Sequence, residues 1–353
     1  MKTALFRLLA VICLLATTNL NAQTSPDGRQ ALAEIAGRTL TAGVLEQQEG
    51  GKLLQARYQY YLNERKALDD LIDDQLLADA ARQKTLTVDQ LLTQEVYKQV
   101  KDPTEDQLQV YYEGLDTQQS YEAIRAQVLE HIRELRRNKA RASYVAALRK
   151  QADISVLLMP PEAEVDLANA YVRGSRSAEI VLVEFADYEC PYCQQVVASI
   201  DQLRKQYGDR IAVAFKDFPL PMHHRSEKAA EAARCAGKQG KFWEYHDVLF
   251  YSKLLDVADL KKHARVLKLD GDAFDECLDN GDMAEAVKKD LEEGKALGLT
   301  GTPSFFVNGH FFSGAVEYAT LKQMVDQQIA VDQRNKSKSM LSSARGAHSP
   351  SGQ

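Results

Sequence analysis

The sequence lacks an excess of positive charge and has only one long apolar run, which lies near its start. Its 353 residues include 44 Lys and Arg against 50 Asp and Glu, for a formal net charge of -6. A chain without a basic field does not attract nucleic acid, so we expect no nucleic-acid partner. With 27% charged residues and a mean hydropathy of -0.37, a polytopic membrane protein is excluded. The length predicts two domains, at roughly 150 residues each.

The apolar run, Leu8 to Ala16, follows two basic residues and precedes small and polar residues up to Ala22. This order is typical of a cleaved signal peptide, and the run is shorter than the about 20 apolar residues of a membrane span. We therefore predict a signal peptide at residues 1–22 and export to the periplasm or extracytoplasmic envelope; an uncleaved anchor is the alternative. Cys13 lies inside this segment without the small preceding residue that lipidation requires.

Cysteine is scarce, with five residues in all, and four remain once the signal peptide is removed. They are Cys190, Cys193, Cys235 and Cys277, an even set that favours disulfide chemistry in an oxidising compartment. Structural zinc would need a second close pair of ligands, and the last two cysteines are 42 positions apart. We expect neither a metal nor a cofactor.

The composition changes along the chain. Apolar residues with helical spacing dominate the first half, and short β-type runs begin only after a segment that contains Pro160 and Pro161. Pro103 and Gly114 are expected to interrupt the helices, and the C-terminal tail has too few apolar residues to fold. The predicted order is a signal peptide at 1–22, a flexible N-terminus at 23–30, a helical domain at 31–158, a linker at 159–174, an α/β domain at 175–330 and a disordered tail at 331–353.

A C-x-x-C motif directly follows a buried type of strand, Ile180 to Phe185, and opens a helix. At a helix N-terminus the free N–H groups and the positive end of the dipole favour a thiolate, so Cys190 is the expected nucleophile. Pro191 suits the first helical turn, and Cys193, one turn later, is the expected resolving thiol.

Glu184 interrupts the apolar strand six residues before Cys190. Burial would raise its pKa and suit it to exchange a proton with Cys193 during the reaction. The alternative is an outward-facing strand residue. Lys216, which closes the next strand, could pair with Glu184, but a solvated strand end is the favoured interpretation.

These features resemble the thioredoxin superfamily, and specifically the DsbA-like thiol-disulfide oxidoreductases of bacterial envelopes. The resemblance covers about Tyr171 to Ala330 and includes Glu184, the C-P-Y-C motif, and Gly301, Thr302 and Pro303 before a strand. It implies an α/β thioredoxin-like fold with a helical insertion, preceded by a separate all-α domain. It also implies that Thr302 and a cis Pro303 shape the site and contact the substrate backbone.

In the same resemblance, the helices between Arg225 and Leu297 form the insertion, whose aromatic residues are expected to be core. Cys235 and Cys277 fall in helical patterns of this insertion, and a structural disulfide between them is the favoured interpretation. Two unpaired core thiols are the alternative, because Cys packs as a small hydrophobe. The adjacent His223 and His224 are interpreted as ordinary loop residues and not as a metal site.

The helical half resembles, through looser motifs, the N-terminal chaperone region of SurA-type peptidyl-prolyl isomerases. The motifs are Ile35 to Thr41, the helix start from Pro103 to Leu108 with Tyr111 and Tyr112, and the helix from Tyr121 to Ile154. The isomerase domain usual in that family is missing, so the resemblance implies client binding alone. A helical spacer or a dimerisation arm is the alternative.

Together the resemblances imply an exported oxidoreductase that oxidises cysteine pairs in folding envelope proteins through a mixed disulfide at Cys190. The implied partners are unfolded or partly folded cysteine-containing proteins, a membrane quinone-linked protein of the DsbB or vitamin K epoxide reductase (VKOR) type and, in one alternative, a second copy of this chain. The alternative functions are an envelope disulfide isomerase or reductase, and a holdase chaperone with a secondary redox site.

Overall fold

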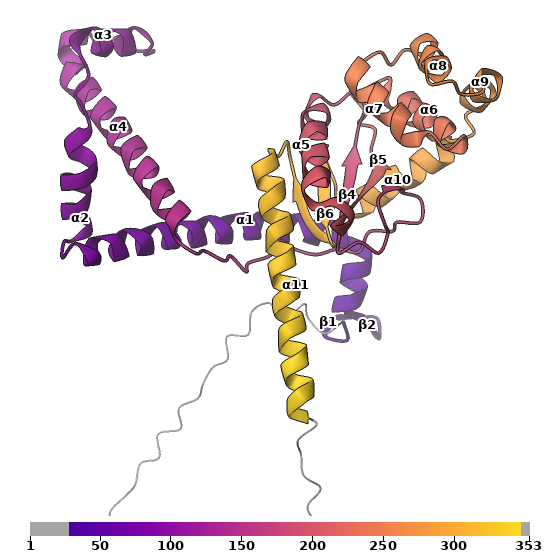
Figure 1. Cartoon of the computed structure of the whole chain (residues 1–353), viewed down its shortest axis with the longest axis horizontal. Coiled ribbons are helices and arrows are strands. Elements are labelled where there is room, and N and C mark those ends of the chain that lie inside the picture. Colours follow the sequence, from indigo (N-terminus) through magenta and orange to yellow (C-terminus); the bar gives the residue numbers. More distant parts are fainter. Residues whose placement is uncertain (1–27, 347–353) are drawn as a thin grey trace, which may run out of the picture. The chain divides into compact units, whose positions relative to one another are not determined.

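The structure is a computed structural model that describes residues 28–346 (Figure 1). The predicted signal peptide and most of the expected flexible N-terminus lie outside the described residues. Contacts divide the chain into two units, one ending at Gly50 and the other beginning at Gly51. Within residues 28–346, no helix combines the length and the apolar character that a membrane span needs.

The first unit contains a β-hairpin, which corrects the prediction of helix from residue 31. β1 (Ala31–Ile35) and β2 (Arg38–Thr41) pair in antiparallel fashion. Ala36 and Gly37, between the strands, have positive φ angles of 48° and 75°. A two-residue turn with both φ angles positive matches the twist of a hairpin. Strands of five and four residues are too short for their alternation to stand out beside the long helical pattern that follows.

Long helices follow the hairpin, as the sequence predicts. The elements are α1 (Ala42–Gln83), α2 (Val88–Leu91), the π-helical η1 (Leu92–Val96), the 3-10 helix η2 (Tyr97–Gln99), α3 (Glu105–Glu113) and α4 (Tyr121–Gln151). Thr104 and Gln107 form a reciprocal capping box at the start of α3, and Gly114 ends that helix. The predicted interruptions at Pro103 and Gly114 are confirmed.

A five-stranded sheet forms the centre of the second half, with the strand order β3-β5-β4-β6-β7. The strands are β3 (Tyr171–Arg173), β4 (Ile180–Ala186), β5 (Ile211–Asp217), β6 (Ser304–Val307) and β7 (His310–Ser313). β4 and β5 are parallel and the other neighbours are antiparallel. The parallel pair is connected through α5 (Pro191–Tyr207) and the 3-10 helix η3 (Gly208–Arg210).

Five helices separate β5 from β6, so the predicted helical insertion is confirmed. They are α6 (Ser226–Lys238), α7 (Phe242–Ser252), α8 (Val257–Val266), α9 (Gly271–Asp279) and α10 (Ala284–Ala296). Phe242, Tyr245 and Phe250 are buried and Trp243 is partly buried, in agreement with a core role for these aromatic rings. The apolar cluster of the insertion includes Cys190 and Cys193, so the insertion forms one wall around the dithiol.

The beginning of the long helix α1 contributes to the core of the sheet. Its Leu54, Tyr58 and Tyr61 belong to the same buried cluster as the β4, β6 and β7 residues. The Tyr58 ring lies 4.8 Å from that of Phe311, and its hydroxyl accepts a hydrogen bond from the Ser313 N–H at 3.3 Å. The helical region is therefore attached to the sheet through shared apolar packing as well as through the chain.

The segment predicted as a linker, residues 159–174, is packed against the sheet. The Ala163 N–H donates to the Gly309 carbonyl at 2.9 Å, and Val165 and Leu167 pack against the sheet cluster. β3 begins at Tyr171, inside the predicted linker. The packing of residues 159–174 could not be predicted, because an irregular segment with two prolines can bury apolar side chains without any regular spacing.

The last helix, α11 (Tyr318–Gly346), corrects the prediction of a disordered tail from residue 331. Leu321 and Val325 anchor its first turns in the sheet core. Few apolar residues follow Val331, but the stretch to Gly346 has no proline and contains several Ser, Lys and Arg residues. A poor apolar content predicts little packing, but it does not prevent a helix, because Lys, Arg, Leu and Met have good intrinsic helix propensity. The part of the expected tail after residue 346 lies outside the described residues.

Candidate active site

The C-x-x-C motif lies where β4 passes into α5, as the sequence predicts. Cys190 is the N-cap residue of α5 and Pro191 occupies its first turn. Cys193 follows one turn later, and both cysteines are buried free thiols. A proline is tolerated at this place because the first N–H groups of a helix have no partner within the helix. The motif therefore presents the Cys190 sulfur to the unpaired N–H groups of α5.

The two thiols differ in acidity in opposite directions. The hydrogen bond from Cys193 lowers the pKa of Cys190 to about 5, and hydrogen bonds from Thr302 and from the Cys193 and Tyr192 backbone help to lower it. Burial raises the pKa of Cys193 well above the usual value for a thiol, and its hydrogen bond to Cys190 adds to this effect. At neutral pH Cys190 is therefore a thiolate, while Cys193 keeps its proton.

Thr302 and Pro303 lie in the loop before β6, beside Cys190. β6 pairs with β4, and Ser304 lies opposite Phe185, which brings the loop before β6 beside the end of β4. The Thr302–Pro303 peptide bond is cis, and the Cys190 Sγ lies 3.4 Å from the Thr302 carbonyl oxygen, which accepts its hydrogen bond in the thiol form. Strand pairing thus joins residues that are 112 positions apart in the sequence.

Glu184 is a buried carboxyl group on β4, with 4% of its surface exposed. Burial raises its pKa to about 8, and the negative charge of Cys190 adds to the rise. Its Oε1 atom finds no hydrogen-bond partner among the described residues. Its charge in turn contributes to the raised pKa of Cys193. A carboxyl group that titrates near neutral pH beside a protonated thiol has the acidity that proton exchange requires.

Lys216 does not pair with Glu184 and is not a solvated strand end. The residue is completely buried, and its ammonium group forms ion pairs with Asp290, at 3.3 Å, and with Glu293. Asp290 also pairs with Arg234, which in turn contacts Asp217 at 2.5 Å. This buried network joins β5 to α6 and α10 and thus fixes the insertion on the sheet.

Cys235 of α6 and Cys277 of α9 are bonded to each other in the structure, with their Cα atoms 6.0 Å apart. Both residues are buried in the apolar cluster of the insertion, which also includes Cys190 and Cys193. The bond closes a loop that spans 42 positions and contains α7 and α8. We propose a structural role for this disulfide, because its cysteines lack the helix start that activates Cys190.

The loop before Cys190 contains a buried carboxylate, Asp187, that the sequence analysis did not single out. Asp187 is buried and accepts hydrogen bonds from the Glu189 N–H at 2.7 Å and the Leu220 N–H at 2.7 Å. His223 also contacts it, with Nδ1 at 2.8 Å. Asp187 therefore fixes the turn before Cys190, and its place three residues before the motif is the signal that could have indicated it.

Within residues 28–346 no group of side chains is arranged to hold a metal ion.

A sheet of this order, a helical insertion and a dithiol at the start of α5 define the second half as a thioredoxin-like domain. In agreement with this, residues 167–327 match the family model described as Thioredoxin. The helical region of α1 to α4 precedes the matched part.

Among curated proteins the chain is similar to parts of much longer ones. It is 37% identical over 168 residues to the Na(+)/H(+) antiporter NhaA 3 of Salinispora tropica. It is 35% identical over 179 residues to the Na(+)/H(+) antiporter NhaA of Herminiimonas arsenicoxydans. These matches cover 47% and 50% of this chain but 26% and 28% of those proteins. The chain thus spans about a quarter of the length of these relatives.

Solved structures of thioredoxin-like proteins are also similar to this chain. The catalytic domain of Proteus mirabilis ScsC is 29% identical, with a TM-score of 0.41, and 46% of this chain and 90% of that one are covered. A thioredoxin-like oxidoreductase from Silicibacter pomeroyi is 27% identical, with a TM-score of 0.42 and coverage of 47% and 97%. Oxidised BdbD from Bacillus subtilis is 22% identical, with a TM-score of 0.45 and coverage of 49% and 99%.

Proposed function

We propose that this protein is a thiol-disulfide oxidoreductase of the extracytoplasmic envelope that oxidises cysteine pairs in folding proteins. The observation that carries the proposal is the opposite acidity of the two thiols, with a pKa of about 5 for Cys190 and a raised pKa for Cys193. A stabilised Cys190 thiolate makes the reduced protein the favoured form, so the oxidised protein gives its disulfide to others. The thioredoxin family match supports the same class of reaction.

The proposed reaction begins with the Cys190–Cys193 disulfide. A client thiolate attacks the Cys190 Sγ, the Cys190–Cys193 bond breaks, and Glu184 gives its proton to the departing Cys193 thiolate. A second client thiolate then attacks the client sulfur of the mixed disulfide. The client disulfide forms and Cys190 leaves as a stable thiolate. Two electrons have passed from the client to the protein, which needs an oxidant to restore its disulfide.

The proposed partners follow from this cycle. Clients are unfolded or partly folded proteins with reduced cysteines, and a quinone-linked membrane protein of the DsbB or VKOR type removes the two electrons. Thr302 and Pro303 are proposed to contact the client backbone, since their loop borders the Cys190 sulfur. The helical region is proposed to bind clients; its exposed apolar residues Leu71, Val110 and Leu135 support this role. Its use as a dimerisation arm is the alternative.

The direction of exchange is tested inside a cell with an oxidising envelope, by trapping thiols in acid at the moment of lysis. We expect Cys190 and Cys193 to be mostly disulfide-bonded, because the redox partner of an oxidase restores its disulfide after each reaction. A mostly reduced pair in a dimeric protein would mean an isomerase. A holdase with a secondary redox site is favoured only if the Cys190→Ala, Cys193→Ala protein still suppresses client aggregation as well as the unchanged protein.

Alkylation of the reduced protein tests the acidity of Cys190. The rate of labelling at Cys190 is expected to rise with pH around a midpoint of about 5 and to be constant at neutral pH, because the thiolate is the reactive form. An unperturbed thiol would show the same rise near pH ~8.5. Iodoacetamide labelling followed by peptide mass spectrometry measures both cysteines at once. Faster labelling of Cys193 at mildly acidic pH would contradict the assignment.

The substitution Glu184→Gln tests the proton exchange with Cys193. In the reduced protein, oxidised glutathione first forms a mixed disulfide at Cys190, and Cys193 must then lose its proton to displace glutathione. The rate of this second step is expected to rise with pH through about 8, as Glu184 becomes a base. Glu184→Gln is expected to slow the step by roughly tenfold or more and to remove this rise.

A matched control is Glu189→Gln, since Glu189 directly precedes Cys190 but lies outside β4 and forms an ion pair with Arg225 at 2.8 Å. Acid quenching and mass spectrometry give the lifetime of the mixed disulfide in each protein. Equal lifetimes and pH profiles for Glu184→Gln and the unchanged protein would remove Glu184 from the mechanism.

A further inference from the structure

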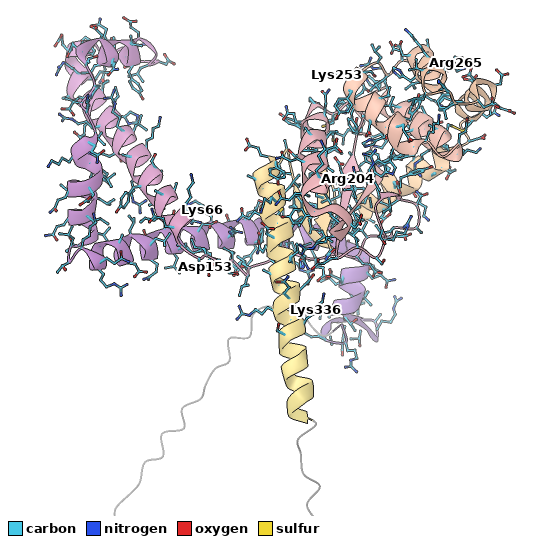
Figure 2. All side chains as sticks on the ribbon, in the orientation of Figure 1. Lys66, Asp153, Arg204, Lys253, Arg265 and Lys336 are labelled. Carbon is cyan, nitrogen blue, oxygen red and sulfur yellow. A yellow bond between two sulfur atoms is a disulfide. The ribbon has the colours of Figure 1, made fainter. Side chains whose placement is uncertain are left out.

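A small cavity lies beside Glu184, on the side where α5 and α7 pack. It has a water-accessible volume of about 20 Å³ and is lined by residues from β3, β4, β5, α5 and α7. One water needs roughly 10–15 Å³ measured in this way, so the cavity has room for one molecule. Its charged lining residues are Arg173, Asp201, Arg204 and Asp247, together with Glu184; Arg204 is labelled on α5 in Figure 2.

Two unsatisfied polar atoms belong to side chains that line this cavity. One is Oε1 of Glu184 and the other is Nε2 of His246, and each is buried without a hydrogen-bond partner in the part of the chain that the structure describes. Glu184 is 4% and His246 5% exposed. A buried polar atom without a partner is costly, and a water shared by both atoms removes the cost.

His246 is connected to the surface through its other ring nitrogen. Nδ1 lies 2.9 Å from Oδ1 of Asp247, whose side chain is 36% exposed. Arg173 pairs with the same carboxylate at 3.0 Å, and its guanidinium lies 4.3 Å over the ring of Trp243, the single tryptophan of the chain. The Nδ1 proton is therefore held by Asp247, which leaves Nε2 as the acceptor of the neutral ring.

We propose that His246 is a positioning residue that moves protons between Glu184 and solvent, through one water held between Glu184 Oε1 and His246 Nε2. The inference rests on the proposed function, because it assigns the route by which the proton of Cys193 leaves the site. It applies in whichever direction the protein exchanges disulfides, since Cys193 gains or loses a proton in each.

The proton balance is complete in the displacement of glutathione from Cys190. The Cys193 thiol gives its proton to the Glu184 carboxylate, the Cys193 sulfur bonds to the Cys190 Sγ, and glutathione leaves as a thiolate. Glu184 then passes a proton to the water, and the water passes one to His246 Nε2. Burial lowers the pKa of His246, so the imidazolium is short-lived and releases the proton to solvent; Asp247 and Asp201 favour its charge and Arg173 opposes it. The two electrons pass from the dithiol to glutathione.

The test compares His246→Phe and His246→Gln with the unchanged protein in the glutathione reaction. Phenylalanine suits this aromatic environment, where the rings of Phe215, Trp243 and Phe250 lie 4.7 to 5.1 Å from His246. Glutamine can hold a water but cannot carry its proton. Both variants are expected to lengthen the lifetime of the mixed disulfide by roughly tenfold and to flatten its pH profile, while alkylation of Cys190 stays within about twofold.

Two further variants complete the test. His263→Phe is the matched control, because His263 is also buried in the insertion but does not line the cavity, and it should leave the lifetime unchanged. Asp247→Asn, on the partly exposed side of the route, keeps the test open if the His246 variants do not fold, and it should lengthen the lifetime too. Lifetimes within about twofold of the unchanged protein in His246→Phe, full recovery in His246→Gln, or an equal change in His263→Phe would overturn the proposal. If the unchanged protein formed no mixed disulfide at all, the proposed function would fail instead.

Discussion

Cys193→Ala is expected to hold clients in a stable mixed disulfide, and Cys190→Ala is expected to abolish exchange altogether. Without the Cys193 sulfur, the bond between Cys190 and a client cannot be displaced from within the protein. Without Cys190, the remaining thiol is completely buried and its raised pKa keeps it protonated. The loss in exchange rate should be at least about a thousandfold, since every exchange in the proposed reaction passes through the Cys190 sulfur.

The measurement is capture of an unfolded client whose single remaining cysteine is joined to glutathione in a mixed disulfide, followed by electrophoresis without reductant. The Cys190 thiolate attacks the client sulfur, the bond between the client and glutathione breaks, and glutathione leaves as a thiolate. A complex that disappears on reduction is expected for Cys193→Ala and not for Cys190→Ala. The double variant Cys190→Ala, Cys193→Ala serves as the control for client binding without covalent chemistry. Equal covalent capture by Cys190→Ala and Cys193→Ala would mean that Cys193 can also attack, against the acidity assigned to it.

Removal of the disulfide between Cys235 and Cys277 is expected to lower the free energy of unfolding by up to about 4 kcal/mol. The bond closes a 42-position separation, and such a cross-link restricts the unfolded chain more than the folded one. The change is best measured by urea unfolding of Cys235→Ala, Cys277→Ala in the Cys190→Ala, Cys193→Ala background. That background prevents exchange between the two cysteine pairs.

The same background without the added substitutions, with and without reductant, is the control for this measurement. Reductant should destabilise it by a similar amount and should have no effect once Cys235 and Cys277 are replaced. Equal unfolding midpoints in all of these samples, or peptide mapping that finds both thiols free after export, would contradict a structural disulfide.

The positions of Cys190, Pro191 and Cys193 could be predicted from the sequence because they depend on neighbours in the chain. A buried type of strand, a turn and an amphipathic helix follow one another directly, so the helix start was visible from local pattern. The burial of Glu184 followed in the same way from the apolar residues on both sides of it. The interruption at Pro103 and the cap at Thr104 are equally local.

Lys216 shows why other features could not be predicted. Its partners Asp290 and Glu293 come from α10, and no local pattern indicates that a lysine at a strand end is neutralised by carboxylates that far along the chain. The cavity beside Glu184 depends in the same way on residues from five separate elements. The hairpin of β1 and β2 was not predicted for another reason: strands of five and four residues are too short for their alternation to stand out next to a helix of 42 residues.

The reduction potential of the Cys190–Cys193 pair tests the central claim most directly. Equilibration of the purified protein with glutathione buffers, followed by acid trapping and mass spectrometry, gives the fraction of disulfide at each ratio. A pKa of about 5 for Cys190 predicts a potential between about -200 and about -120 mV, in the range of proteins that donate disulfides. A value at or below about -270 mV, where reductants such as thioredoxin lie, would contradict net oxidation.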